Sequence, residues 1–274
     1  MSFKAKIKQV AKEKGITTQQ VPQNYLIEAF LTKLSQSQYR ENFIVKGGYL
    51  ISGMIGLDLR ATMDLDATIK GFELTPENLS RIAKEIVKLP TDESFKFEFQ
   101  GIEEIRETDD YPGYRLKLLA TFEQMNENVT VDVTTGDVIT PKEISFNFKK
   151  MFDDDTIHLL SYPLETILAE KIETILSRGI AITRPRDFYD VYILSRLKNE
   201  QINYEILKHA VENTKKKRRS VFEIAEYKQI FDELKESEFQ RQLWEKYQKQ
   251  YNYAKGTSHD NLIIACRELL DKCI

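Results

Sequence analysis

The pattern of apolar and polar positions changes repeatedly along the first 160 residues. Apolar residues recur at helical spacing over Val21–Leu34, which predicts a helix. The short apolar run Phe43–Val45 indicates a strand that stops at Gly47 and Gly48. The remaining pattern predicts helices over Tyr49–Leu57 and Glu77–Leu89, strands over Asp64–Ile69, Phe95–Phe99, Tyr114–Phe122 and Val129–Val133, and a turn at Asn126–Asn128.

Beyond Tyr162 the strand pattern disappears and helical spacing takes over. Six segments show it: Leu164–Arg178, Phe188–Leu197, Tyr204–Val211, Ile224–Leu234, Phe239–Tyr251 and Leu262–Leu270. Mixed sequence followed by all-helical sequence is typical of an α+β protein. We therefore expect an N-terminal domain with a mixed sheet over residues 1–160 and an all-helical domain over residues 161–274.

Composition excludes several classes of protein. Of the 274 residues, 41% are hydrophobic and 30% charged, which is typical of a globular chain. The net charge of -3 excludes a molecule that binds nucleic acid through its overall charge. The sequence contains no apolar run of the roughly 20 residues that a membrane helix needs. Cys266 and Cys273 are too far apart on one predicted helix for a disulfide, which indicates the reduced thiols of a cytoplasmic protein.

Three acidic residues of the first half are candidate metal ligands. Asp64 and Asp66 are two apart on a predicted strand, so both carboxylates project to the same side, where Mg²⁺ would relieve their repulsion. Asp132 is an acid within the apolar strand Val129–Val133. Upstream, Gly47 and Gly48 join a strand to a helix N-terminus, where backbone N–H groups can cradle a phosphate. Taken singly, such an acid pair is more often solvated surface and such glycines a tight turn.

The second half offers a group of charged residues on two predicted helices. Lys171 and Arg178 are seven apart and share a helical face, and Asp187 and Asp190 are neighbours on the next helix. A lysine there could stabilise charge on phosphate oxygens, and a carboxylate could act as a general base. The alternative is an ion-pair network, which would also include Arg186, that holds the two helices together.

Four segments of the chain carry a family resemblance. Phe43–Leu50 with Arg60–Asp66 resembles the opening motif of polymerase-β-like nucleotidyltransferases, and most closely that of the AbiEii/AbiGii toxin family. Glu170–Arg178 with Arg184–Tyr192 resembles the family's helical signature. Many members have Ser or Thr after the glycines, where this chain has Tyr49.

The resemblance implies a nucleotidyltransferase-like N-terminal domain and a helical domain that completes the active-site cleft. It implies transfer of a nucleotidyl group from an NTP to a hydroxyl, with Mg²⁺ (or Mn²⁺) on Asp64, Asp66 and Asp132. Lys171 would contact the nucleotide phosphates and Asp190 or Asp187 would serve the reaction. We assign the remaining nucleotide contacts to Lys46, Gly47, Gly48, Arg178 and Asp187. The implied acceptor is RNA, such as a tRNA 3′ end, and the implied partner is a cognate antitoxin.

Other interpretations of the sequence remain open. The chain could be a catalytically silent nucleotide- or RNA-binding protein of the same fold, or it could modify a protein or a small molecule. The basic run Lys215–Arg219 is either a solvated helix end or a phosphate-binding patch for RNA. The stripe of Trp244, Tyr247 and Tyr251 is predicted to be core packing rather than a platform for bases.

Overall fold

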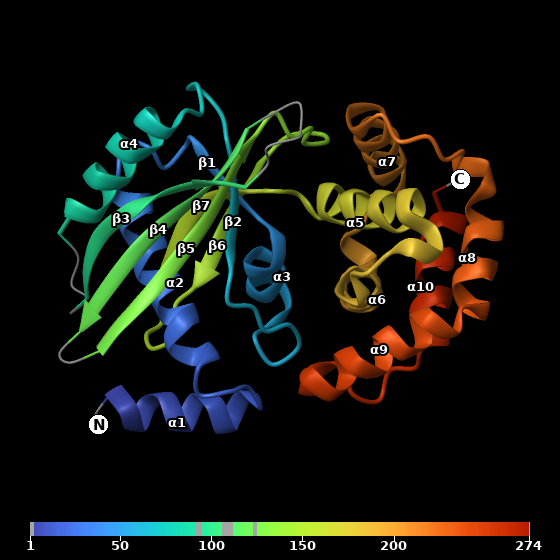
Figure 1. Cartoon of the computed structure of the whole chain (residues 1–274), viewed down its shortest axis with the longest axis horizontal. Helices are drawn as coiled ribbons and strands as arrows, with labels where there is room; N and C mark the ends of the chain where they lie inside the picture. The colour runs from blue at the N-terminus through green and yellow to red at the C-terminus, as the bar shows by residue number, and fades with distance from the viewer. Residues whose placement is uncertain (1–2, 91–94, 106–111, 123–124, 274) are drawn as a thin grey trace. The chain divides into compact units, whose positions relative to one another are not determined.

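The computed structural model describes residues 3–90, 95–105, 112–122 and 125–273. The chain divides into two units. The first consists of Met1–Asp137 and Glu143–Ser161, and the second of Val138–Lys142 and Tyr162–Ile274. Figure 1 labels the helices and strands of both units, which are described separately below.

A seven-stranded mixed sheet is the centre of the first unit. Its order is β3-β4-β5-β2-β1-β7-β6. The strands are β1 (Phe43–Lys46), β2 (Leu65–Ile69), β3 (Lys96–Glu104), β4 (Gly113–Phe122), β5 (Met125–Thr135), β6 (Ile144–Lys149) and β7 (Thr156–Ser161). The pairs β1–β7 and β2–β5 are parallel, and the other neighbours are antiparallel.

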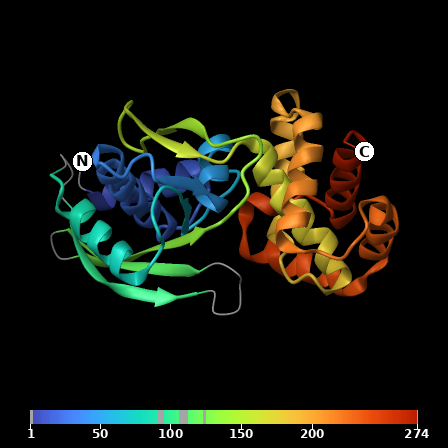
Figure 2. The same ribbon diagram turned by 90° about the horizontal axis from the view of Figure 1, so that it is seen from above.

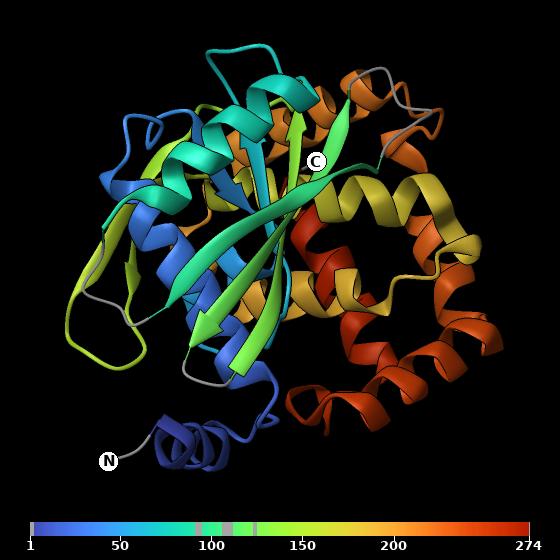
Figure 3. The same ribbon diagram turned by 60° about the vertical axis from the view of Figure 1, so that its left-hand side comes forward.

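Four helices accompany this sheet: α1 (Phe3–Lys14), α2 (Gln20–Gln36), α3 (Gly47–Ile55) and α4 (Pro76–Lys88). The helix α2 packs against β5 and β7, α3 against β1 and β2, and α4 against β3. Figure 3 shows α2 and α4 side by side, which agrees with the contacts between them. Thr75 caps α4 by accepting a hydrogen bond from the Asn78 N–H, and Pro76 follows at the first helical position.

Alternation along β2 and β5 decides which side chains reach the core. Leu65, Ala67 and Ile69 are buried in β2, while Asp66 between them is only half-buried. In β5, Val131 and Val133 are likewise buried and Asp132 is half-buried. Apolar residues therefore fill one face of these two central strands, and the acids lie on the opposite face.

The α+β prediction with a mixed sheet is confirmed, and two details of the strand prediction are wrong. Asn126–Asn128 lies inside β5 and not in a turn. The strands β6 and β7 were not predicted, and for β6 the reason is that, at the sheet edge, it buries only Phe148 fully. An edge strand with so few buried positions leaves little alternating pattern in the sequence.

The second unit is helical throughout its described elements (Figure 2). The helices are α5 (Leu164–Arg178), α6 (Pro185–Leu197), α7 (Tyr204–Arg218), α8 (Tyr227–Glu236), α9 (Glu238–Gln250) and α10 (His259–Asp271). Both cysteines are free and buried. No helix in the described part of the chain is long and apolar enough to cross a membrane.

Two members of the aromatic stripe, Trp244 and Tyr247, are core packing, as the sequence predicts, whereas Tyr251 follows the end of α9 and is half-buried. Trp244 is 2% exposed, stacks between Tyr189 and Tyr247, and donates its indole N–H to the Thr257 carbonyl at 2.8 Å. An indole with both ring contacts and a satisfied N–H is held by the interior. It is therefore not a surface on which bases could stack.

We expect Trp244→Ala to lower the free energy of unfolding by about 3–5 kcal/mol, because it removes a large buried side chain and leaves a cavity. Urea unfolding followed by circular dichroism measures this change. Phe239→Ala is the matched control on the same helix, since Phe239 is 51% exposed, and should change the value by less than about 1 kcal/mol. Equal losses in the two variants would contradict the assignment of Trp244 to the core.

Candidate active site

The turn between β1 and α3 leaves no room for a side chain at position 47. Gly47 has φ +68°, a conformation that favours glycine, and a Cβ added there would lie 2.2 Å from Asp66 Oδ2. At Gly48 an added Cβ would lie 2.9 Å from Thr62 Oγ1. The two glycines therefore let the segment that carries the acid pair pack directly against the start of α3.

The N-terminus of α3 can accept an anion. The first N–H groups of a helix have no partner within the helix, and Lys46 at the N-cap position makes no capping hydrogen bond through its side chain. These N–H groups and the helix dipole favour a phosphate. Because the Asp66 carboxylate lies against Gly47, phosphate oxygens and a metal ion on Asp66 could be neighbours here.

Strand register places the predicted residues in one row across the sheet. Lys46 on β1 pairs with Asp66 on β2, Asp66 pairs with Asp132 on β5, and Asp132 pairs with Arg115 on β4. Side chains in register on neighbouring strands share a face of the sheet. Asp64 precedes Asp66 by two residues and is exposed just before β2 begins.

The two residues at the ends of this row, Lys46 and Arg115, each form an ion pair. Arg115 Nε and Nη2 donate to Asp132 Oδ1 and Oδ2 at 2.7 and 2.8 Å, so that both oxygens of that carboxylate are engaged. Hydrogen bonds and charge from Asp132 raise the pKa of Arg115, and the charge of Asp64 raises it further. Asp64 thus lies close enough to influence the same guanidinium.

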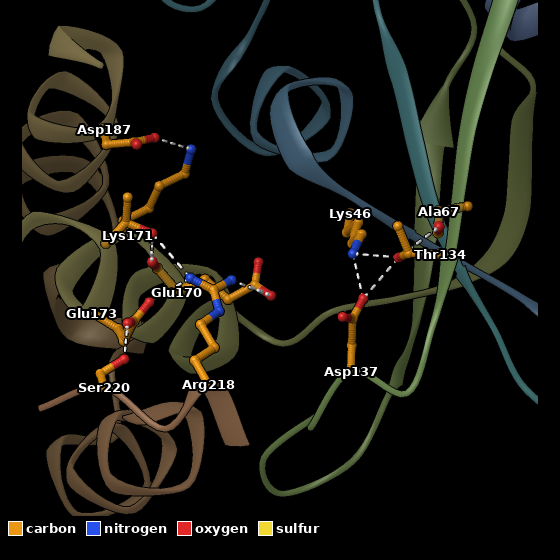
Figure 4. A network of polar contacts seen from close by, with 11 residues as sticks. Lys46, Ala67, Thr134, Asp137, Glu170, Lys171, Glu173, Asp187, Arg218 and Ser220 are labelled. Atoms are coloured by element: carbon orange, nitrogen blue, oxygen red, sulfur yellow. Dashed lines mark hydrogen bonds and ion pairs between the residues drawn. The ribbon is translucent and has the colours of Figure 1, made fainter. Parts of the chain in front are cut away.

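The Lys46 ammonium is held by neighbouring side chains of the first unit. Its ammonium, on a side chain that is 9% exposed, donates to Thr134 Oγ1 at 2.8 Å and pairs with Asp137 (Figure 4). Thr134 Oγ1 also donates to Asp137, at 3.0 Å. This network ties β1 to the end of β5, and a nucleotide contact by Lys46 stays a prediction.

The donor chemistry of Asp64 and Asp66 fits Mg²⁺. Magnesium is held by oxygen ligands, often one or two carboxylates together with substrate phosphates. The described residues contain no group of three or more His, Cys, Asp or Glu side chains that could hold a metal ion. The predicted third ligand, Asp132, stands beside Asp66 in the sheet and is held by Arg115.

In the second unit, Lys171 pairs with both predicted acids. Its Nζ lies 2.6 Å from Asp187 Oδ1 and 3.0 Å from Asp190 Oδ2, and both carboxylates are fully buried (Figure 4 shows the Asp187 contact). Arg184 Nε lies 3.0 Å from the other Asp187 oxygen. These residues form an ion-pair network between α5 and α6. The arginine of the network is Arg184, whereas Arg178 and Arg186, which the sequence suggested for it, are exposed.

The basic run Lys215–Arg219 contains a second structural ion pair. Arg218 donates to Glu170 at 3.3 Å and to Thr174 Oγ1 at 3.0 Å, and it pairs with Glu173, which is 2% exposed (Figure 4). Ser220 donates to the same Glu173 carboxylate. Arg218 therefore joins α7 to α5. Arg218 and Glu173 are 45 residues apart in the chain, so no local sequence pattern indicates this role.

Sequence reasoning missed Arg115, and the wrong turn explains why. With a turn at Asn126–Asn128, the register of the hairpin would be shifted and Asp132 would face another residue of β4. The observed hairpin pairs Phe122 with Met125, which brings Arg115 opposite Asp132. A hairpin register is set by its connection, so a short error there changes every cross-strand partner.

Comparison with known proteins identifies the family of the chain. The family model "Nucleotidyl transferase AbiEii toxin, Type IV TA system" matches residues 29–268. The chain belongs to the AbiEii nucleotidyltransferase toxin family. The family resemblance predicted from the motifs is thus confirmed. None of the curated proteins compared with the chain matches it significantly.

Two solved structures share the fold of this AbiEii-family chain. The crystal structure of JHP933 from Helicobacter pylori has a TM-score of 0.53 at 14% identity, covering 94% of each chain. A putative nucleotidyltransferase from H. pylori has a TM-score of 0.51 at 14% identity, covering 94% of this chain and 97% of that chain. At this identity the likeness shows the fold alone.

We expect Arg218→Ala to lower the free energy of unfolding by about 3 kcal/mol, because it leaves the buried Glu173 charge without its guanidinium. Lys216→Ala removes an exposed cation from the same run and should change it by less than about 0.5 kcal/mol. Chemical unfolding of both variants measures the difference. If the two behaved alike, Arg218 would not anchor α7 to α5.

Proposed function

We propose that this AbiEii-family chain is a cytoplasmic, metal-dependent enzyme that transfers NMP from an NTP to a hydroxyl of RNA, with tRNA as the expected acceptor. The observation that supports it most is the contact between Gly47 and Asp66. A helix N-terminus suited to phosphate and a carboxylate suited to Mg²⁺ lie side by side there. Nucleotidyl transfer needs both functions at one place.

In the reaction, the acceptor oxygen attacks the α-phosphorus, a new P–O bond forms, the bond to pyrophosphate breaks, and the hydroxyl proton passes to a base. The N–H groups of the first turn of α3 would bind phosphate oxygens, and Asp64 and Asp66 would hold the metal. When bound, Mg²⁺ neutralises negative charge on the phosphates. Asp132 would be the third ligand, and to bind the metal it would have to leave Arg115.

We carry the roles predicted for the residues of the helical unit into this proposal. Lys171 is the proposed contact to nucleotide phosphates and Asp190 the proposed acid–base residue, with Asp187 as its neighbour. Their burial means that a substitution also removes a charge from a buried network. Tests of these residues therefore need a stability measurement beside the activity measurement.

The toxin family supports an antitoxin as partner, and RNA as acceptor is part of the proposal that the assay below must test. The basic run provides cations for a phosphate backbone, with the exposed Lys216 as an example, although Arg218 is committed to Glu173 and Glu170. Binding of RNA by this run would therefore depend on its lysines.

Labelling of RNA tests the proposed function. Purified protein with Mg²⁺, each labelled NTP in turn and total RNA should transfer label to RNA, and chelation of the metal should stop the transfer. Asp66→Asn should lower the rate at least about a hundredfold, because it removes a metal-binding charge. Asp58→Asn, which changes an exposed acid of the same unit, should leave the rate unchanged.

Three results of this assay would contradict the proposal: no label in RNA with any NTP, unchanged transfer without a divalent metal, or full activity of Asp66→Asn. Label found in protein or in a small molecule would keep the chemistry and replace the acceptor.

Removal of Arg115 tests the role of Asp132 as a metal ligand. An ion pair as exposed as that between Arg115 and Asp132 contributes about 1 kcal/mol to stability. A metal ion that binds Asp132 must displace Arg115 from it. We therefore expect Arg115→Met to lower the Mg²⁺ concentration for half-maximal labelling about fivefold. Lys117→Met is the control two residues further along β4, where it breaks the exposed pair with Glu103. An unchanged or higher Mg²⁺ requirement in Arg115→Met would remove Asp132 from the metal site.

A further inference from the structure

A cavity of about 570 Å³ lies in the helical unit, lined by residues of α6, α7, α10 and the turn that follows α6. Figure 1 labels these three helices. Its volume is in the range of ligand sites. Lys171, Asp187 and Asp190 are not among its described lining residues, so the cavity is separate from the ion-pair network of α5 and α6.

The first cation of this wall is Arg196, in the last turn of α6. Its guanidinium carbon lies 5.3 Å from the centroid of the Tyr192 ring, one helical turn earlier, and the guanidinium donates to the Tyr192 hydroxyl. Arg196 is exposed, and it pairs with no carboxylate in the described part of the chain. Its charge is therefore open to an anion that enters the cavity.

The second cation is Lys272, directly after α10, and it repeats this arrangement. Its ammonium lies 5.3 Å from the centroid of the Tyr204 ring and donates to the Tyr204 hydroxyl at 3.3 Å and to Asn199 Oδ1 at 3.0 Å. Tyr204 also donates to Asn199 Oδ1, at 2.7 Å. Lys272 is exposed, and all of the partners found for it among the described residues are neutral.

These two cations differ from others in the same unit. Cations that join one helix of the unit to another meet carboxylates there: Lys171, Arg218, Arg241 and Arg267. A cation near the C-terminus of its helix is stabilised by the dipole, and both Arg196 and Lys272 have that position. The dipole does not require a tyrosine ring beneath each cation or a cavity beside it, so these two features indicate a ligand.

The rest of the lining adds groups that can meet the edge of a base. Asn261 and Glu268 are exposed and seven residues apart, so they share a face of α10. An amide both donates and accepts, and a carboxylate accepts from the amino group of a base. Cations for phosphates, aromatic rings for stacking and polar groups for base edges together are typical of sites for single-stranded nucleic acid.

We propose that this cavity binds a single-stranded segment of RNA. Arg196 and Lys272 pair with phosphates, a base stacks on the Tyr204 ring, and Asn261 and Glu268 meet the edges of bases. An acidic peptide would leave the ring without a role and would be repelled by Glu268. The choice of RNA rests on the proposed function, in which RNA is the acceptor, whereas the binding itself needs neither NTP nor a metal.

Fluorescence anisotropy of a short labelled oligocytidylate, in EDTA and without NTP, tests this assignment on the full chain. We expect saturable binding that weakens as salt rises. Arg196→Gln and Lys272→Gln should each weaken it at least about fivefold and lower the slope of log affinity against log salt by about 0.7, the contribution of one phosphate of a single strand. Lys246→Gln removes an exposed cation of α9 outside the cavity and should change neither quantity.

Two substitutions of one residue separate stacking from hydrogen bonding. Tyr204→Leu removes the ring and should weaken binding about tenfold, because a base loses its stacking surface. Tyr204→Phe keeps the ring and should leave the affinity within about twofold. Both variants lose the hydroxyl, so the difference between them reports the ring alone, with circular dichroism as the check of folding.

The proposal is overturned if oligocytidylate does not bind, or if Arg196→Gln, Lys272→Gln and Lys246→Gln have equal effects. Loss of binding in Lys216→Gln alone would place the RNA on the basic run Lys215–Arg219 instead. Displacement by polyglutamate as effective as that by unlabelled oligocytidylate would replace RNA with an acidic protein segment.

The outcome is independent of the labelling assay. A chain that binds oligocytidylate through Arg196 and Lys272 but transfers no label contradicts only the proposed transferase activity. A chain that labels RNA, and in which neither substitution weakens binding, contradicts only this binding site.

Discussion

The close approach of Asp66 to the backbone of Gly47 is the constraint on which the candidate site depends. A residue other than glycine would be strained by the positive φ and would overlap the Asp66 carboxylate. The contact holds because β1 and β2 pair with Lys46 opposite Asp66, and because α3 begins directly where β1 ends. The proposed phosphate-binding start of α3 and the proposed metal-binding acid are therefore positioned by one turn.

Both units neutralise their buried charges locally. Asp132 is held by Arg115, Lys46 by Asp137, Asp187 and Asp190 by Lys171, and Glu173 by Arg218. A buried charge without a partner is expensive, so each of these residues has a structural role before any substrate arrives. Residues that resemble catalytic ones in the sequence can hold the fold together and still serve the reaction.

The fold could be predicted to a large extent, because the long helices and the central strands have strong periodic patterns. Gly47, Asp64 and Asp66 were predicted as site residues because the features that suggest them are local: a strand that ends in glycine, and two acids on alternate positions. Arg115 could not be predicted, since its partner depends on a hairpin register that the sequence does not state. The pairing of Lys46 with Asp137 depends in the same way on residues far apart in the chain.

The central claim is that the Gly47 turn and Asp66 form one site for a metal and a phosphate. Binding of Mn²⁺, followed by electron paramagnetic resonance with and without a non-hydrolysable NTP analogue, tests it directly. We predict that the analogue tightens Mn²⁺ binding at least about tenfold in the native chain, and that Gly47→Ala abolishes this coupling while the protein stays folded. The same coupling in both proteins would contradict the account.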